Sequence, residues 1–164
     1  MQVANTRKIV GPLAQAFAGD PWQHLQVIGI TGTNGKTTTA TLLYELLSHS
    51  GKAVSLLGTV SKRVLDREIP STLTTSDPIE LANDMQAMVN AGSTYLVMEV
   101  SSHALDQYRV NGIPFTIAIF TNITHDHLDY HGDIEAYMKA KKKLFDDLKP
   151  VSYTHLRAHE TLPY

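Results

Sequence analysis

A glycine-rich loop between an apolar run and a helical pattern constrains the fold of this chain more than any other feature. Residues 25–30 are a short apolar run rich in β-branched side chains, and the apolar side chains of residues 37–50 recur with helical spacing. The loop between them reads TGTNGKTT over residues 31–38. Its glycines let successive backbone N–H groups turn toward an anion, and the start of the helix adds the positive end of its dipole. We therefore predict a strand, a phosphate-binding loop and a helix in this order.

The loop is a short variant of the P-loop of nucleotide-binding proteins. The general pattern has glycine at position 30, where this chain has Ile30. Lys36 is placed to reach the β and γ phosphates of ATP, and the Thr37 hydroxyl to bind Mg²⁺. A strand-to-helix turn without a ligand is the alternative interpretation. The predicted ATP-binding residues are Gly32, Thr33, Asn34, Gly35, Lys36, Thr37 and Thr38.

The rest of the pattern alternates between apolar strands and amphipathic helices. Further strands are predicted over residues 53–60, 95–100 and 115–120, helices over 77–92 and 133–148, and an irregular or hairpin stretch over 61–75. Continuous apolar strands separated by helices are typical of a sheet covered on both faces. The predicted fold class is therefore α/β, a mainly parallel sheet with flanking helices of the P-loop NTPase type. In such sheets ligands bind beyond the carboxyl ends of the strands.

Size, charge and composition exclude several classes of protein. The 164 residues fit one domain, and a formal net charge of -2 gives no reason to expect a nucleic-acid partner. No apolar run approaches the roughly 20 residues of a membrane-spanning helix, so we expect no membrane insertion. There is no cysteine for a disulfide or a thiolate, which suits a reducing compartment. We expect a cytoplasmic protein and a monomer.

The sequence divides into three segments. Residues 1–24 are predicted to be a linker or the remnant of an N-terminal domain, and residues 25–150 an ATP-binding domain that is cut short after its last helix. Residues 151–164 show no apolar period that would extend the sheet, and residues 152–161 resemble translated sequencing-adapter sequence. We predict that they are a non-native tail, with a natural variable tail as the alternative.

Four motifs in order carry a resemblance to a known family. They are TGTNGKTT (residues 31–38), LTTSDP (73–78), MEVSSHAL (98–105) and TNITHDHLDYHG (121–132). Together they resemble the Mur ligase superfamily, in particular the branch that adds the third residue of the peptidoglycan stem peptide. The similarity extends from about residue 27 to residue 150. It implies the central, ATP-binding domain of such a ligase.

Glu99 and the histidines are the candidate metal ligands. Glu99 ends a buried strand, where an ionised carboxylate is costly unless it is paired or binds a metal. With Thr37 and the γ-phosphate it is predicted to hold Mg²⁺, and the resemblance implies the same role. The resemblance also implies that His127 contributes to a second Mg²⁺ site. We interpret His125 and His131 as solvated or hydrogen-bonded side chains, and we reject a zinc site because cysteine is absent.

Lys141 is singled out among the lysines of the last predicted helix. Lys139, Lys142 and Lys143 are interpreted as the solvated face of that helix. By its position after the DHLD motif, Lys141 matches the family lysine that reacts with CO₂ to form a carbamate, an anion that helps to position Mg²⁺. A buried lysine with a lowered pKa suits this reaction, because only the neutral amine is nucleophilic.

The resemblance also implies a set of substrate-binding side chains. Hydroxyl and amide groups suit sugar and amide oxygens, and a guanidinium suits a carboxylate or phosphate. Ser76 departs from the proline or glycine common at its position in the family, and Asn122 and His103 are interpreted as supporting residues. The predicted residues that bind the UDP-N-acetylmuramoyl-dipeptide are Thr74, Thr75, Ser101, Gln107 and Arg109.

The activity implied by the resemblance is ATP-dependent amide-bond formation through an acyl phosphate, with an amino acid, meso-diaminopimelate or L-lysine, as the second substrate. Lys36, Lys141 and His127 are the predicted catalytic residues. Two alternatives remain: a ligase similar to folylpolyglutamate synthase, and an inert nucleotide-binding module. We expect turnover from a full-length parent enzyme and none from this chain alone.

Overall fold

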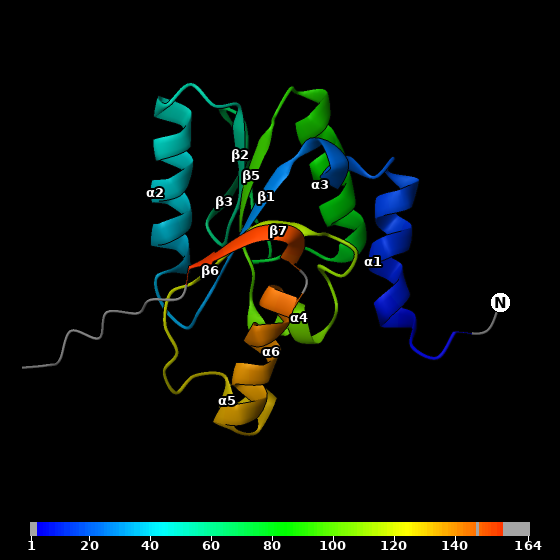
Figure 1. Cartoon of the computed structure of the whole chain (residues 1–164), viewed down its shortest axis with the longest axis vertical. Helices are drawn as coiled ribbons and strands as arrows, with labels where there is room; N and C mark the ends of the chain where they lie inside the picture. Colours follow the sequence, from blue (N-terminus) through cyan, green and yellow to red (C-terminus); the bar gives the residue numbers. More distant parts are fainter. Residues whose placement is uncertain (1–2, 147, 156–164) are drawn as a thin grey trace, which may run out of the picture.

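The computed structural model describes residues 3–146 and 148–155 of the chain, and its centre is a twisted sheet between layers of helices (Figure 1). The seven strands lie in the order β4-β3-β2-β5-β1-β6-β7. Their bounds are β1 (Gln26–Thr31), β2 (Val54–Leu57), β3 (Ser61–Val64), β4 (Arg67–Pro70), β5 (Tyr95–Glu99), β6 (Phe115–Phe120) and β7 (Leu148–His155). The helices are α1 (Thr6–Phe17), η1 (Pro21–His24), α2 (Lys36–His49), α3 (Pro78–Asn90), α4 (Ser102–Asp106), α5 (Leu128–His131) and α6 (Ile134–Asp146).

The central strands are parallel, which confirms the predicted fold class. β1 pairs in parallel with β5 on one side and with β6 on the other, and β2 pairs in parallel with β5. In this register Ile30 lies opposite Glu99, and Thr31 opposite Phe120. The carboxyl ends of β1, β5 and β6 therefore meet at one edge of the sheet, where a ligand site is expected.

Alternate side chains of each strand point to opposite faces of the sheet and form two cores. On β1, Val27 belongs to one core and Ile28 and Ile30 to the other. The second core packs under α2, through Ala40 and Tyr44. The first core is larger and packs under α3, on the face opposite α2 (Figure 1). Burial on both faces explains why the strand sequences are continuously apolar.

The stretch over residues 61–75 contains a hairpin, as one of the two predicted forms. β3 pairs antiparallel with β2 and with β4. Lys62 of β3 is buried, and its Nζ donates to Glu80 Oε1 at 2.5 Å and to Asp84 Oδ2 at 2.6 Å, both on α3. Burial opposes the charge of Lys62, but these two carboxylates outweigh it and raise the lysine pKa. The ion pairs attach the hairpin to α3.

The N-terminal segment, predicted to be a linker or the remnant of an N-terminal domain, contains a packed helix. α1 contacts α3, and its Gly11 and Pro12 lie against the turn at Asn111 and Gly112. Pro12 has no N–H to donate to the Lys8 carbonyl one turn earlier. Asn111 Nδ2 donates to that carbonyl at 2.6 Å instead, so the interior proline leaves no unpaired acceptor there.

The end of the described chain extends the sheet, although residues 151–164 show no apolar period that would indicate a strand. β7 pairs in parallel with β6, with Ile117 opposite Tyr153 and a register shift between Phe115 and Ile117. Backbone hydrogen bonding rather than an apolar period forms this edge strand. The predicted non-native origin of residues 151–164 stays a prediction, and residues 156–164 lie outside the described residues. Within the described part of the chain, no helix has the length and apolar character needed to cross a membrane.

Candidate nucleotide and metal site

The first turn of α2 has backbone N–H groups and no side chain to cap them. Its N-cap is Gly35, in the left-handed region at φ 81°, and no acidic residue lies in the first turn. The contrast is α3, where the Asp77 side chain accepts from the N–H groups of Ile79 and Glu80. The start of a helix without a cap carries unpaired donors and the positive end of the dipole. The α2 terminus therefore suits an anion such as a polyphosphate.

The loop before α2 is held in shape by the end of β6. The N–H of Thr33 donates to the Asn122 carbonyl at 2.9 Å, and the N–H of Asn34 donates to Asn122 Oδ1 at 3.0 Å. Asn122 Nδ2 returns a bond to the Asn34 carbonyl at 3.1 Å. At Gly32, with φ 150°, an added Cβ would lie 1.9 Å from Thr121 Oγ1. The close approach of β6 requires glycine at this position and orders the loop in advance of any ligand.

Two lysine amines converge on one carbonyl of this loop. Lys36 Nζ donates to Gly32 O and Thr33 O, both at 2.9 Å, and Lys141 Nζ donates to the same Gly32 O at 2.8 Å. Burial lowers the pKa of Lys36, against the charges of Glu99 and Asp126. Burial, and then the charge of Lys36, lower the pKa of Lys141 to about 7. Lys141 is 2% exposed, whereas Lys139 and Lys142 are exposed, as predicted for the solvated face of α6, and Lys143 is partly buried.

Glu99 is buried at the end of β5 and is surrounded by neutral donors. The residue is 1% exposed. Its Oε2 accepts from the Thr37 hydroxyl at 2.9 Å and from the Thr59 hydroxyl at 3.0 Å, and its Oε1 accepts from the Thr59 N–H at 2.9 Å. At Gly58 an added Cβ would lie 2.8 Å from Oε1, so the chain comes close to the carboxylate only because glycine is there.

The surroundings of Glu99 fit a magnesium ion. Among the described residues no lysine, arginine or histidine forms an ion pair with this carboxylate. A buried carboxylate whose hydrogen-bond partners are all neutral suits a cation, and Mg²⁺ uses one or two protein oxygens together with phosphate. Glu99 and Thr37 supply these oxygens beside the α2 terminus. A cavity of about 150 Å³ opens next to them, and its lining includes Thr37, Gly58, Ser61 and Glu99. The described residues contain no group of three acidic, histidine or cysteine side chains suited to a metal.

The predicted substrate residues lie together beside Glu99, and hydrogen bonds connect most of them. Thr75 is buried, and its hydroxyl donates to the Glu99 carbonyl at 2.9 Å and accepts from the Ser101 N–H at 3.1 Å. Arg109 donates to the Thr75 carbonyl at 3.0 Å, and through Nε and Nη2 to Gln107 Oε1. The Ser101 hydroxyl caps α4 by accepting from Ala104. Thr74 is partly exposed. The structure brings these residues together, and their contact with a substrate stays a prediction.

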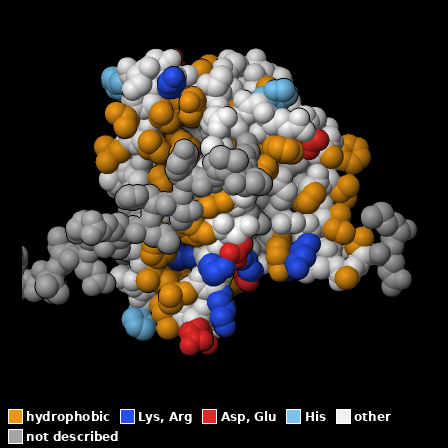
Figure 2. All heavy atoms as spheres, in the orientation of Figure 1, with side chains coloured by type: hydrophobic (Ala, Val, Ile, Leu, Met, Phe, Trp, Pro, Cys, Tyr) orange, Lys and Arg blue, Asp and Glu red, His pale blue; other side chains and the backbone are white. Residues whose placement is uncertain are grey.

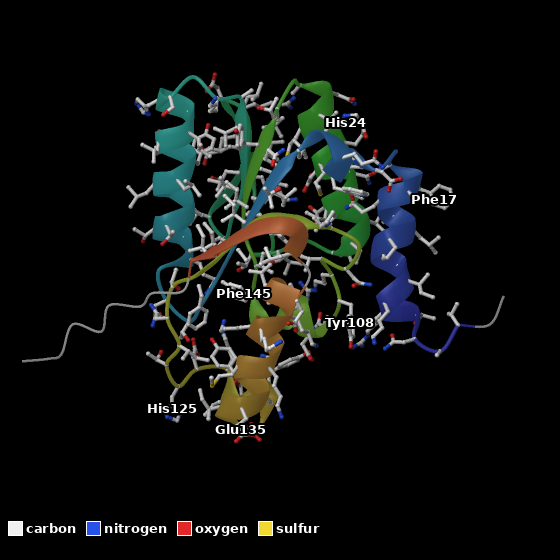
Figure 3. All side chains as sticks on the ribbon, viewed as in Figure 1. Phe17, His24, Tyr108, His125, Glu135 and Phe145 are labelled. Carbon is white, nitrogen blue, oxygen red and sulfur yellow. The ribbon has the colours of Figure 1, made fainter. Side chains whose placement is uncertain are left out.

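Three of the histidines, His103, His127 and His131, lie close together. The His103 ring lies 5.0 Å from His127 and 5.6 Å from His131, and His131 Nε2 is 3.0 Å from Ser102 Oγ. Burial, and then the neighbouring histidine, lower the pKa values of His103 and His131, which favours their neutral forms. His125 is exposed and lies at the outer edge of its loop (Figure 3). Among the described contacts, no hydrogen bond or ion pair joins His127 to Glu99 or Thr37, so its metal role stays a prediction.

Three residues of the site were not predicted from the sequence. Thr59 donates to the Glu99 carboxylate. The charge of Asp126 opposes the lowering of the pKa values of Lys36 and Lys141. The Tyr137 hydroxyl lies 3.1 Å from Thr33 Oγ1. The Tyr137 ring also lies under Lys141, with Nζ 4.4 Å from the ring centroid. The GT pair at residues 58–59, at the carboxyl end of a predicted strand, is the only sequence signal that marks Thr59.

Comparison with known proteins decides the family of this fold and site. The family model described as the Mur ligase middle domain matches residues 30–161. The chain belongs to the Mur ligase middle-domain family. The resemblance deduced from the four motifs is thereby confirmed.

Relatives and solved structures of the Mur ligase family agree with this assignment. The chain is 50% identical over 146 residues to a UDP-N-acetylmuramoyl-L-alanyl-D-glutamate–2,6-diaminopimelate ligase of Parabacteroides distasonis, covering 89% of this chain and 30% of the relative. A solved structure of a ligase with the same name has a TM-score of 0.76 and 35% identity, covering 88% and 31%. MurF ligase of Thermotoga maritima in complex with ADP has a TM-score of 0.60 at 22% identity, covering 94% and 32%, and shows the fold alone. The chain therefore spans about a third of the length of these proteins.

Proposed function

We propose that this chain is the ATP-binding domain of a ligase that joins diaminopimelate to UDP-N-acetylmuramoyl-L-alanyl-D-glutamate in peptidoglycan synthesis. One observation supports the proposal that the domain binds ATP: the uncapped α2 terminus, the Lys36 amine and the Thr37–Glu99 pair meet at one loop. The names of the relatives support the choice of substrates and favour diaminopimelate over L-lysine. The ligase whose structure was solved with ADP supports nucleotide binding at this fold.

The chemistry proceeds in two steps. The terminal carboxylate of the UDP-linked dipeptide attacks the γ-phosphorus of ATP, which forms an acyl phosphate and releases ADP. The amine of the incoming amino acid then attacks the acyl carbon, and the tetrahedral intermediate collapses to an amide and phosphate with loss of a proton from nitrogen. A carboxylate oxygen is a poor leaving group, and phosphorylation makes it a good one.

The protein's main task in the first step is to bring two anions together. The N–H groups of the α2 terminus and the Lys36 ammonium hold the polyphosphate, for which Lys36 Nζ exchanges its bonds to the Gly32 and Thr33 carbonyls for phosphate oxygens. Thr37 and Glu99 would hold a Mg²⁺ ion, which would neutralise further phosphate charge. Preorganisation by Asn122 lowers the cost of ordering the loop.

Lys141 is proposed to react with CO₂. With a pKa of about 7, a large fraction of the amine is neutral near neutral pH. Its nitrogen forms a bond to the carbon of CO₂ and loses one proton to solvent, which yields a carbamate anion. This change turns the amine beside Lys36 into an anion, which Lys36 then neutralises. NMR of the protein in ¹³C-bicarbonate tests the step: a carbamate signal is expected, and it should be absent from Lys141→Met.

The remaining assignments concern substrate and second-metal contacts. Thr74, Ser101, Gln107 and Arg109 are proposed to bind the UDP-linked dipeptide, with Thr75 supporting them from the interior. His127 is proposed to contribute to a second Mg²⁺ site. A cytoplasmic location is also proposed, and the absence of cysteine is compatible with it. We also propose that the protein is a monomer.

A folylpolyglutamate synthase-like ligase and an inert nucleotide-binding module are the two alternatives. The names of the closely similar relatives and the MEVSSHAL and DHLDYH motifs favour the peptidoglycan ligase over the first. The second alternative, an inert nucleotide-binding module, would bind ATP without using it to form a product. Since the chain spans about a third of its relatives, we propose that substrate and amine selection require further domains.

The test is an assay of the full-length protein that contains this domain. ATP, Mg²⁺, the UDP-linked dipeptide and diaminopimelate or L-lysine are supplied, and product is followed by mass spectrometry together with phosphate release. Product and equimolar phosphate are expected only when every component is present. Phosphate release that does not depend on the UDP-linked dipeptide would contradict the proposal. The 164-residue chain alone is expected to bind ATP and form no amide.

A further inference from the structure

Thr59 contacts both sides of the candidate site. It is exposed in the turn between β2 and β3, yet its N–H and its hydroxyl both reach the buried carboxylate of Glu99, at 2.9 Å and 3.0 Å. Its hydroxyl also lies 3.1 Å from the Thr74 hydroxyl, in the segment proposed to bind the UDP-linked dipeptide. Thr59 is thus a hydrogen-bonding partner of both the Glu99 carboxylate and the Thr74 hydroxyl.

The Thr59 hydroxyl has one proton and two acceptors within reach. It can donate to Glu99 Oε2 or to Thr74 Oγ1, but not to both at once. A substrate group that binds the Thr74 hydroxyl therefore changes the fraction of time in which the Thr59 hydroxyl donates to Glu99. The N–H of Thr59 has no such choice and holds Oε1 in either case.

Two of the three donors to the Glu99 carboxylate belong to Thr59. The third donor is the Thr37 hydroxyl, 2.9 Å from Oε2. If Thr37 held an ion through an oxygen lone pair, its hydroxyl proton would remain available to Glu99. Thr59 supplies the other hydrogen bonds that orient the carboxylate, including the one to Oε1. Residues that orient a metal ligand typically change metal affinity about 10-fold to 100-fold when they are removed.

We propose that Thr59 is a positioning residue that orients Glu99 for magnesium and couples this orientation to occupancy of Thr74. The inference rests on the proposed function, because it requires that Glu99 bind the Mg²⁺ of a bound nucleotide. Thr75 differs from Thr59, since its hydroxyl binds the main-chain carbonyl of Glu99 and fixes the strand end rather than the carboxylate.

The first experiment measures ATP binding by the 164-residue protein as a function of Mg²⁺ concentration. Thr59→Val removes the hydroxyl and keeps the shape, and Thr59→Ser is the matched control that keeps the hydroxyl. Thr59→Val is expected to raise the half-saturating Mg²⁺ concentration about ten-fold, while Mg²⁺-free ATP affinity and the thermal unfolding midpoint change little. Thr59→Ser is expected to behave as the unsubstituted protein. A merely structural role would instead change Mg²⁺-free binding or the unfolding midpoint.

The second experiment tests the coupling with Thr74→Val. Removal of the Thr74 acceptor leaves the Thr59 proton to Glu99, so the half-saturating Mg²⁺ concentration is expected to fall about two-fold or more, and not at all in the Thr59→Val background. Equal effects of Thr74→Val in the two backgrounds overturn the coupling. An unchanged Mg²⁺ dependence in Thr59→Val overturns the positioning role and leaves the proposed function intact. Absence of Mg²⁺-dependent ATP binding in the unsubstituted protein overturns both.

Discussion

The Thr37 hydroxyl donates a 2.9 Å hydrogen bond to Glu99 Oε2, which joins the first turn of α2 to the end of β5. The two residues are 62 positions apart in the sequence. Parallel pairing of β1 with β5 places them together, because the loop that begins α2 follows β1 directly. The candidate metal site is therefore a consequence of the strand order.

Glu99→Gln is expected to remove the Mg²⁺ dependence of ATP binding. The substitution keeps the size of the side chain and removes the charge that attracts the cation. Calorimetric titration with ATP should show an affinity gain from Mg²⁺ that is at least about ten-fold smaller than in the unsubstituted protein. Glu135→Gln, on the exposed face of α6, is the control and should retain the full gain (Figure 3). An equal response in both variants would exclude Glu99 as a ligand.

Gly32→Ala is expected to destabilise the protein by more than Gly92→Ala. Both glycines have positive φ, but an added Cβ at Gly32 would lie 1.9 Å from Thr121 Oγ1, whereas nothing lies within 4 Å at Gly92. Backbone strain alone costs about 1–2 kcal/mol, and the clash at Gly32 adds to it. Urea denaturation measures both changes. Similar losses would show that the loop moves away from β6 at little cost.

Stability is expected to rise with pH because of Lys141. Its pKa is lowered from 10.5 to about 7 in the folded protein, so between these values the unfolded chain binds more protons. The stabilising contribution of the neutral amine is complete above pH 10.5 and is lost as pH falls through about 7. In CO₂-free buffer, the free energy of unfolding should rise relative to that of Lys141→Met by up to about 1.4 kcal/mol per pH unit in this window. Parallel pH profiles of the two proteins would contradict the lowered pKa.

Gly11→Ala is expected to weaken the docking of α1. An added Cβ would lie 2.2 Å from the Asn111 carbonyl oxygen, and this turn also supplies the bond that Pro12 cannot make to Lys8. Overpacking of this kind costs about 1–3 kcal/mol in unfolding free energy. Ala16→Ser, on the exposed side of the same helix, should change it by less than about 0.5 kcal/mol. A neutral Gly11→Ala would show that α1 contributes no stability.

The packing of α1 could not be predicted from the residues near it in the sequence. Figure 2 shows hydrophobic side chains over α1 and charged ones around the lower helices. Phe17 is 91% exposed at the end of α1, and the buried residues of this helix are Gly11 and Gln15 rather than large apolar side chains. Its packing depends on Gly11 and on the turn at Asn111, which is 100 residues away, and no local pattern reports such a contact.

The central strands and the phosphate loop, by contrast, were predictable from the sequence. Each is encoded within a few consecutive residues, as apolar runs and as a glycine-rich turn before a helix. Glu99 was recognised because a carboxylate at the end of an apolar strand is costly. The choice of Lys141 was implied by family resemblance, but its burial and its bond to Gly32 required the three-dimensional structure. β7 was missed because an edge strand needs only backbone pairing with β6.

The most direct test of the nucleotide site is calorimetric titration of ATP, with Mg²⁺, into Lys36→Ala and its control Lys142→Ala. Lys36 Nζ lies in the loop at the α2 terminus, whereas Lys142 is exposed on α6 and pairs with Asp146. Loss of a charge-assisted phosphate contact is expected to weaken ATP binding by at least about ten-fold in Lys36→Ala. Lys142→Ala should bind ATP as the unsubstituted protein does. Equal affinities of the two variants would contradict binding of the polyphosphate by this loop.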